Sequence, residues 1–368
     1  MKFLARERGV MEAMLPGLDE TLAAAPFEKV EGRDRWAVEQ FVAAGGVGLA
    51  APLESGGKGC SALVMTRLQR AVGARAPSLA VASTMHHYKV KTLDVLLEGE
   101  RRRFLSRMVE RRWLIASCGA EGFRSKSLFE PTMRARKVEG GLVLTGSKKP
   151  CSLIWSMGVL SMMVRTDDGG LYNVLIPVDQ LQLERRKFWN SPVLAATESD
   201  EVILQEALIV DDLLFELGST DAAAPFTFAA FLWFELLISA SYLGIASRLA
   251  EYPIVETLGS SHSRASLGIE LETSMAALEC IARGIDDGEE DEAALLERLL
   301  YVRYGVQAAI GRASSLAAEL SGGGAFLRDG EVAMVLAATK GLSYHAPSRE
   351  GISDKLAENL CGGQLPLI

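Results

Sequence analysis

The sequence is short of the residues that build disulfide frameworks and metal sites. Its 368 residues include 4 histidines and 5 cysteines, and no two cysteines have Cys-x-x-Cys spacing. An odd, dispersed set of thiols is typical of a reducing cytoplasm. We therefore expect a cytoplasmic protein without a bound metal. The cysteines are Cys60, Cys118, Cys151, Cys280 and Cys361.

Basic residues are also few. The chain has 39 Lys and Arg against 47 Asp and Glu, a formal net charge of -8, and no basic stripe that could neutralise a phosphate backbone. This balance argues against nucleic acid as a partner. Residues 1–19 lack the continuous apolar core of a secretory signal. The most apolar stretch, residues 222–245, contains Glu235, so it predicts a buried helix and no membrane partner.

Helical periodicity is present and is interrupted once. Apolar residues recur at helical spacing over about 34–108 and again from residue 225 onward, whereas residues 114–215 read as short strands separated by turns. Glu139-Gly140-Gly141 predicts a hairpin. We expect an N-terminal helical domain (1–115), a small antiparallel sandwich or barrel (116–215) and a C-terminal four-helix bundle (216–368). The predicted C-terminal helices cover 227–252, 264–285, 291–321 and 331–342.

Six short strings occur in an order and spacing that resemble the acyl-CoA dehydrogenase family. The most specific is the hairpin string from Val138 to Lys148. A second is the glycine-rich string Gly322-Gly-Gly-Ala-Phe-Leu-Arg-Asp329, near the C-terminus. The resemblance implies an α+β, mostly α fold and an FAD-dependent flavoprotein. The other strings are 48–59, 77–87, 120–135 and 199–210.

The resemblance also implies which residues contact FAD. Ser152 falls where the family keeps a hydroxyl near the reactive nitrogen of the flavin. Gly322 and Gly323 fall where a neighbouring subunit's pyrophosphate would bind, because a glycine turn lets backbone N–H groups approach phosphate; a simple turn between two helices is the alternative. The remaining positions carried over are Cys118, Ala120, Ser125, His345 and Ser348.

Several positions depart from the family pattern. The usual Thr of the flavin loop is Ala120, the aromatic that covers the flavin is Pro150, and the Arg that meets the partner's flavin is absent from residues 255–259. The usual catalytic Glu aligns with Ala346. These departures keep open the possibility that the chain is a cofactor-poor subunit or a binding protein that has lost FAD.

Glu235 is the candidate base that replaces the missing Glu. It is the only carboxylate in a long apolar run, and burial raises the pKa of a carboxyl group, as at many active sites. The alternatives are a structural Glu paired with an arginine such as Arg248 or Arg264, and a Glu that lies at the rim of the bundle. His345 is a second candidate for a functional polar residue beside the flavin. The alternative is a packed, hydrogen-bonded histidine.

The resemblance places first the FAD-dependent α,β-dehydrogenation of an acyl thioester, with acyl-CoA or an acyl-carrier protein as the substrate. Lys126, Phe231 and Tyr242 are the candidate substrate-binding residues, and the pair His86-His87 belongs either to the structure or to the substrate mouth. A flavin oxygenase or oxidase of the same fold is the alternative. A homodimer or homotetramer is expected, or a heteromer with a related subunit.

Overall fold

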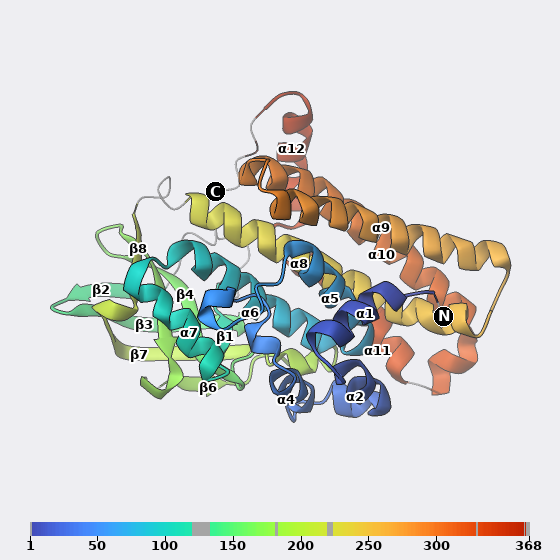
Figure 1. Cartoon of the computed structure of the whole chain (residues 1–368), viewed down its shortest axis with the longest axis horizontal. Helices are drawn as coiled ribbons and strands as arrows, with labels where there is room; N and C mark the ends of the chain where they lie inside the picture. Colours follow the sequence, from blue (N-terminus) through green and yellow to red (C-terminus); the bar gives the residue numbers. More distant parts are fainter. Residues whose placement is uncertain are drawn as a thin grey trace.

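The computed structural model describes residues 2–119, 133–180, 183–218, 224–328, 330–363 and residue 365. A β-sheet forms one end of the molecule and helices form the rest, with the helix α8 (Ala224–Val255) running through the middle (Figure 1). Helices from the N-terminal and C-terminal parts of the chain contribute to one shared hydrophobic core, whereas the sheet has a core of its own. The expected fold class, mostly helical with a central sheet, is confirmed; the exact domain boundaries stay a prediction.

The N-terminal helices begin where the sequence supplies the right residues. The side chain of Ser61 accepts a hydrogen bond from the Val64 N–H at 3.3 Å and so caps α5, and Pro77 occupies the first turn of α6, where no N–H is needed. The sequence had not resolved the helices before residue 34. The bounds are α1 Ala5–Met14, α2 Leu18–Ala24, α3 Phe27–Val30, α4 Trp36–Ala43, α5 Ala62–Arg75, α6 Pro77–Leu96 and α7 Arg103–Glu110.

The predicted hairpin forms the centre of the sheet. Strands β2 and β3 pair antiparallel, with Val138 opposite Gly141 and Gly140 at a φ of 79° in the turn. The sheet is mixed, however, because β4 pairs parallel with both β1 and β2, and the expectation of an all-antiparallel sandwich or barrel was wrong on this point. The bounds are β1 Leu114–Ser117, β2 Arg134–Val138, β3 Gly141–Cys151, β4 Met157–Thr166, β5 Leu171–Pro177, β6 Glu184–Arg186, β7 Asp200–Val210 and β8 Leu214–Gly218.

The C-terminal bundle follows the predicted helices closely but adds one more. The chain kinks at Gly322, whose φ of 77° breaks the helical path of α10, and a further helix, α12, had not been predicted. Ser348 caps that helix by accepting a hydrogen bond from the Gly351 N–H at 3.2 Å. The bounds are α9 Ser261–Asp287, α10 Glu292–Arg328, α11 Gly330–Ala338 and α12 Arg349–Leu360.

Helix α8 is long and apolar enough to cross a membrane, but 78% of its most apolar window is buried inside the protein. Two glycines explain how closely α5 approaches it. A Cβ on Gly73 would lie 2.4 Å from the carbonyl oxygen of Ser241, and a Cβ on Gly244 would lie 2.3 Å from that of Arg70. Helix α8 is therefore the core helix predicted from its sequence, packed backbone to backbone against α5.

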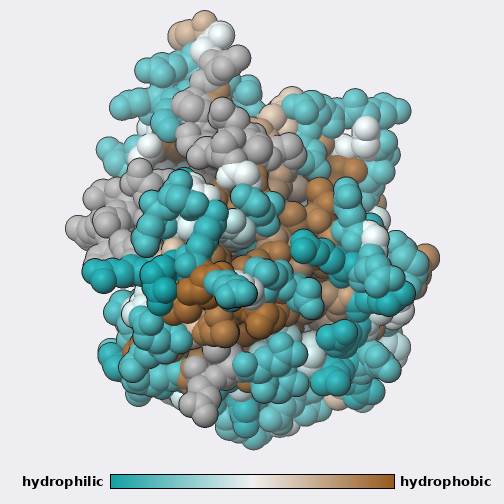
Figure 2. All heavy atoms as spheres, turned by 90° about the vertical axis from the view of Figure 1, so that its left-hand side faces the viewer, coloured by the Kyte–Doolittle hydropathy of each residue, from teal (hydrophilic) through white to brown (hydrophobic). Residues whose placement is uncertain are grey.

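The face at the sheet end carries apolar side chains in its middle, surrounded by hydrophilic ones (Figure 2). Helix α6 reaches this end from the bundle, where it packs beside β1. The fold thus brings β1, α6 and α8 together, and the candidate site lies where these elements meet.

Candidate active site

A chain of hydroxyl groups lies where β3 ends and β7 begins. The Oγ of Ser152 lies 2.8 Å from the Oγ of Ser199, which in turn donates to the Oγ1 of Thr197 at 2.8 Å. Leu153, with a φ of 64°, turns the chain directly after Ser152. All three hydroxyl residues are buried. Ser152 is therefore held by a partner, Ser199, that directly precedes the neighbouring strand β7.

The end of β1 lies beside this chain. The N–H of Cys118 donates to the carbonyl oxygen of Ser161 at 2.9 Å, and its thiol is a neighbour of Cys151, the residue before Ser152. Burial, assisted by Cys118, raises the pKa of the Cys151 thiol, so that thiol is no nucleophile at neutral pH. Three of the predicted cofactor or substrate residues, Ala120, Ser125 and Lys126, lie outside the described residues.

An aromatic cluster of Tyr88, Phe234, Tyr242 and His345 connects the sheet to the bundle. The rings of Tyr88 and Phe234 are 5.4 Å apart, and those of Phe234 and His345 are 5.7 Å apart. Tyr88 also hydrogen-bonds Ser117 of β1 through its hydroxyl, and burial raises the pKa of Tyr88 to about 12. The structure thus brings together the β1 edge and two predicted site residues, Tyr242 and His345.

His345 is neutral at physiological pH. Burial, with the charge of Arg303 adding to the effect, lowers its pKa to about 4. Its Nε2 lies 3.1 Å from the hydroxyl of Tyr242, and no hydrogen bond to Nδ1 is found among the described residues. A neutral imidazole held against two aromatic rings can accept or donate one hydrogen bond to a small ligand.

Glu235 lies on α8, like Phe234 and Tyr242, and is fully buried. Its side chain and that of Arg303 are both 0% exposed, and the Oε2 of Glu235 lies 2.5 Å from the Nε of Arg303. Burial raises the pKa of Glu235 to about 7, while Arg303 opposes the shift. The arginine partners considered from the sequence are engaged elsewhere: Arg248 pairs with Glu331, and Arg264 binds backbone carbonyls.

The remaining predicted residues lie apart from this junction. Gly322 and Gly323 lie at the kink in α10, and α10 leads into α11 at the end of the bundle away from the sheet (Figure 1). A contact with a neighbouring subunit's flavin stays a prediction. Ser348 is exposed and caps α12. Phe231 is partly buried against the helical core.

Both histidines of the pair on α6 are buried, but their contacts differ. In His86, Nδ1 accepts from the Ile115 N–H at 3.1 Å and Nε2 lies 3.0 Å from the Val47 carbonyl oxygen, so this ring joins three segments of backbone. His87 packs edge-on to Phe41, and neither of its ring nitrogens has a hydrogen-bond partner in the part of the chain that the structure describes. The structural alternative fits His86.

Lys89, two residues further along α6, was missed by the sequence reasoning. Its side chain is only 7% exposed, and burial lowers its pKa to about 8, with Cys118 and Lys148 acting on it in opposite directions. A buried ammonium beside the β1 edge suits a ligand that carries excess negative charge. No local pattern in the sequence marks it, because Lys89 stands between the pair His86-His87 and Lys91 in a mixed polar part of α6.

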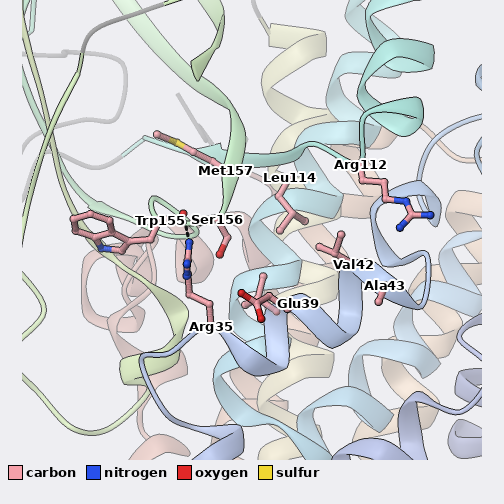
Figure 3. Close-up of a pocket in the computed structure, with 10 residues that line it drawn as sticks. Arg35, Glu39, Val42, Ala43, Arg112, Leu114, Trp155, Ser156 and Met157 are labelled. Atoms are coloured by element: carbon pink, nitrogen blue, oxygen red, sulfur yellow. Dashed lines mark hydrogen bonds between the residues drawn. The ribbon is translucent and has the colours of Figure 1, made fainter. Parts of the chain in front are cut away.

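A separate hollow lies between α4 and the turn that leads into β4 (Figure 3). Arg35 closes one side by donating from Nη1 to the Trp155 carbonyl oxygen at 3.2 Å. None of the site residues predicted from the sequence lines it. Among the described residues, no group of three or more His, Cys, Asp or Glu side chains could hold a metal ion. The lining residues are Arg35, Val38, Glu39, Val42, Ala43, Arg112, Leu114, Trp155, Ser156 and Met157.

No model of a protein family matches the chain. It is similar to isobutylamine N-hydroxylase of Streptomyces viridifaciens, with 35% identity over an alignment of 379 positions that covers 100% of both chains.

Two solved structures show the same fold at low identity. TdsC from Paenibacillus sp. A11-2, solved with FMN and indole, has a TM-score of 0.85 and 17% identity, covering 98% of each chain. The prolyl acyl carrier protein oxidase AnaB has a TM-score of 0.83 and 16% identity, covering 97% of this chain and 99% of its own.

Proposed function

The chain belongs to the acyl-CoA dehydrogenase-like flavin enzymes, and from that premise we propose that it is a flavin-dependent monooxygenase that hydroxylates the nitrogen of a small primary amine. The reaction is RNH2 + O2 + reduced flavin → RNHOH + H2O + oxidised flavin. One oxygen atom enters the N–O bond, and the other leaves as water. The reduced flavin supplies the two electrons.

One observation carries this proposal: the similarity to isobutylamine N-hydroxylase extends over the whole of both chains. A fold alone does not determine function, but 35% identity without a missing domain supports a shared reaction class. The aromatic cluster supports it further, since the partly buried ring of Phe234 lies edge-on to His345, and an apolar wall beside a polar group suits a short alkyl amine.

The residues at the sheet edge fit a flavin. A flavin ring needs a few hydrogen-bonding groups at its edge and apolar walls. Ser152 and Ser117 supply hydroxyls, and Lys89 supplies a buried positive charge suited to an electron-rich reduced ring. Bound flavin would supply the activation of dioxygen and the transfer of one oxygen atom. FAD was expected from the sequence, whereas TdsC was solved with FMN, so both are tested below.

His345 would orient the amine. The nitrogen must present a lone pair to be hydroxylated, so it must react as the free amine. Two features disfavour an ammonium ion in the aromatic cluster: its desolvated surroundings and the nearby guanidinium of Arg303. The neutral His345 ring can then accept a hydrogen bond from the amine N–H. Dependence of kcat/KM on pH should follow the free amine and rise about tenfold per pH unit below the pKa of the substrate.

Dehydrogenation of an acyl thioester is the second candidate. It is favoured by the raised pKa of Glu235, to about 7, and by the fold shared with AnaB. It requires a carboxylate that reaches the α-carbon of the substrate. Glu235 is fully buried and engaged by Arg303, which leaves this reaction less well supported than oxygenation.

The test is a single-turnover reaction. Protein mixed anaerobically with chemically reduced FMN or FAD, then with oxygen and isobutylamine, is expected to yield a product heavier than the amine by one oxygen, measured by mass spectrometry. Reduced flavin without protein is the control. A parallel reaction contains the protein, oxidised FMN or FAD, and acyl-CoA in place of the amine. An unsaturated acyl thioester in that reaction, with reduction of the flavin and with no amine product in the first, would establish the second candidate instead. Protein that binds neither reduced flavin would favour a binding protein without a cofactor.

A further inference from the structure

The buried ion pair of Glu235 and Arg303 is linked to the candidate site by the loop of residues 341–347, which lies between α11 and α12. This loop contains a short 3₁₀ helix, Gly341–Tyr344, followed directly by His345. It has no strand or long helix to fix its path. Its position must therefore come from side chains of the helices beneath it.

Arg303 of α10 holds the loop by its backbone. Its Nη2 donates to the carbonyl oxygens of Leu342 at 3.1 Å and His345 at 3.0 Å. The planar guanidinium can serve these two acceptors through Nη2 while its Nε lies against the carboxylate of Glu235, as an ion pair and not as an aligned hydrogen bond. A lysine at this position could not reach all three partners at once.

Glu235 of α8 is the counter-charge of that arginine. Both side chains are 0% exposed with Nε and Oε2 2.5 Å apart, and no other cation pairs with Glu235 among the described residues. Two charges are costly to bury, and removing one leaves the other uncompensated in the interior. The carboxylate thus keeps the guanidinium in place beneath the loop.

Two tyrosines hold the same loop at its ends. The hydroxyl of Tyr304, next to Arg303, donates to the Pro347 carbonyl oxygen at 2.8 Å. The hydroxyl of Tyr242 meets the His345 ring, and a Cβ on Gly341 would lie 2.4 Å from that same hydroxyl. Side chains from α8 and α10 therefore grip the loop on both sides of His345.

We propose that Glu235 and Arg303 are positioning residues: Glu235 fixes Arg303, and Arg303 fixes the loop that places His345 in the aromatic cluster. The proposal rests on the amine-orienting role of His345 for its effect on turnover. It assigns Glu235 a function in which the carboxylate never touches the substrate. The ion pair is retained, in this view, because it specifies one conformation of a loop that has little other structure.

The experiment compares Glu235→Gln, Arg303→Lys and Arg303→Met with wild type. Hydrogen–deuterium exchange of the peptide covering 339–348 is expected to become at least tenfold faster in all three. The imidazole NMR signals of His345, one of only 4 histidines, are expected to shift and broaden. In the amine assay kcat should fall at least tenfold, while flavin affinity changes less than twofold.

Arg70→Met is the matched control. Arg70 is equally buried, at 0% exposure, and pairs with Glu7 and Glu272, so its removal reports the general cost of deleting a buried guanidinium. It should leave exchange of 339–348 and the His345 signals as in wild type. If Arg303→Met does not fold, the isosteric Glu235→Gln and the charged Arg303→Lys still decide the matter.

The outcomes separate the two proposals. Exchange is measured without substrate or flavin, so an inactive wild type would refute amine hydroxylation and leave the positioning test intact. Wild-type exchange and His345 signals in both Glu235→Gln and Arg303→Lys would overturn the positioning role. Loss of turnover in Glu235→Gln with an unchanged loop would also overturn it, and would make Glu235 a reacting group.

Discussion

The hydroxyl of Tyr242 lies 3.1 Å from Nε2 of His345, a contact that joins the middle of α8 to the loop before α12. Burial raises the pKa of Tyr242, so the phenol stays protonated and the pair remains a neutral hydrogen bond. Tyr242→Phe keeps the ring and removes this bond. We expect amine hydroxylation to fall roughly 2- to 10-fold, since a hydrogen bond contributes about 0.5–1.5 kcal/mol. His345→Ala should lower it by at least about 100-fold.

Tyr301→Phe provides the control for Tyr242→Phe. Among the residues that the structure describes, the hydroxyl of Tyr301 bonds Leu356 and Asn359 of α12, so this variant also loses a tyrosine hydroxyl from the bundle without touching His345. Its steady-state kinetics should match wild type. Equal losses in Tyr242→Phe and Tyr301→Phe would mean that stability, and not the His345 contact, determines the rate.

Ser152 is expected to contribute a hydrogen bond to the flavin. Ser152→Ala removes a hydroxyl held by Ser199, and the loss of one hydrogen bond of about 0.5–1.5 kcal/mol should weaken flavin binding roughly 2- to 10-fold. Fluorescence titration with FMN and FAD measures the change, and the exposed Ser315 of α10, as Ser315→Ala, serves as the control. Unchanged affinity in Ser152→Ala would place the flavin elsewhere.

Local sequence patterns predicted the elements, and long-range contacts decided the site. The hairpin at Gly140 and the helical period of α8 are local properties, and both were confirmed in the structure. The partner of Glu235 could not be predicted, because Arg303 looks like any other arginine in a helix that alternates polar and apolar residues. The parallel pairing of β1 with β4 was missed for the same reason, since it depends on chain segments separated by the whole hairpin.

The exposed end of α10 is expected to bind a second copy of this chain. Phe326 and Leu327 are 50% and 83% exposed, directly after the break at Gly322–Gly323 that the family resemblance assigns to a partner's flavin. Leu327→Asp should convert a dimer or tetramer towards monomer in light-scattering measurements and weaken flavin retention. Leu53→Asp, at a residue 74% exposed in the N-terminal part, should do neither. A monomeric wild type would contradict the expectation.

Gly244 is predicted to be essential to the packing of α5 on α8. A Cβ there would lie 2.3 Å from the Arg70 carbonyl oxygen, and backbone cannot move aside as a side chain can, so Gly244→Ala should destabilise the protein by about 1–3 kcal/mol. In Gly305→Ala nothing lies within 4 Å of the new Cβ, and the better helix propensity of Ala should add about 0.5–1 kcal/mol. Urea denaturation measures the free energy of unfolding of both variants, which should fall in Gly244→Ala and rise in Gly305→Ala. A neutral Gly244→Ala would mean that the helices separate easily.

His86 should make folding stability fall in mild acid. Burial lowers its pKa to about 4 from an ordinary value of 6.5, so between these values the unfolded chain binds a proton that the folded protein excludes, and stability is lost as pH falls through that window. The loss is on the order of 3 kcal/mol for one such histidine. Raised pKa values at Glu235 and Glu31 act in the opposite direction, so the comparison must be made between variants.

The comparison uses His86→Gln against His262→Gln. His86→Gln loses at least one of the two backbone contacts of the ring and should be less stable at pH 7 by about 1–3 kcal/mol. Its stability should then decline less than that of wild type between pH 6.5 and pH 4, so that the two curves converge. His262 is exposed, and its replacement should leave the wild-type curve unchanged. Parallel curves for His86→Gln and wild type, measured by urea denaturation across that range, would show that His86 is protonated in the folded protein as readily as in the unfolded chain.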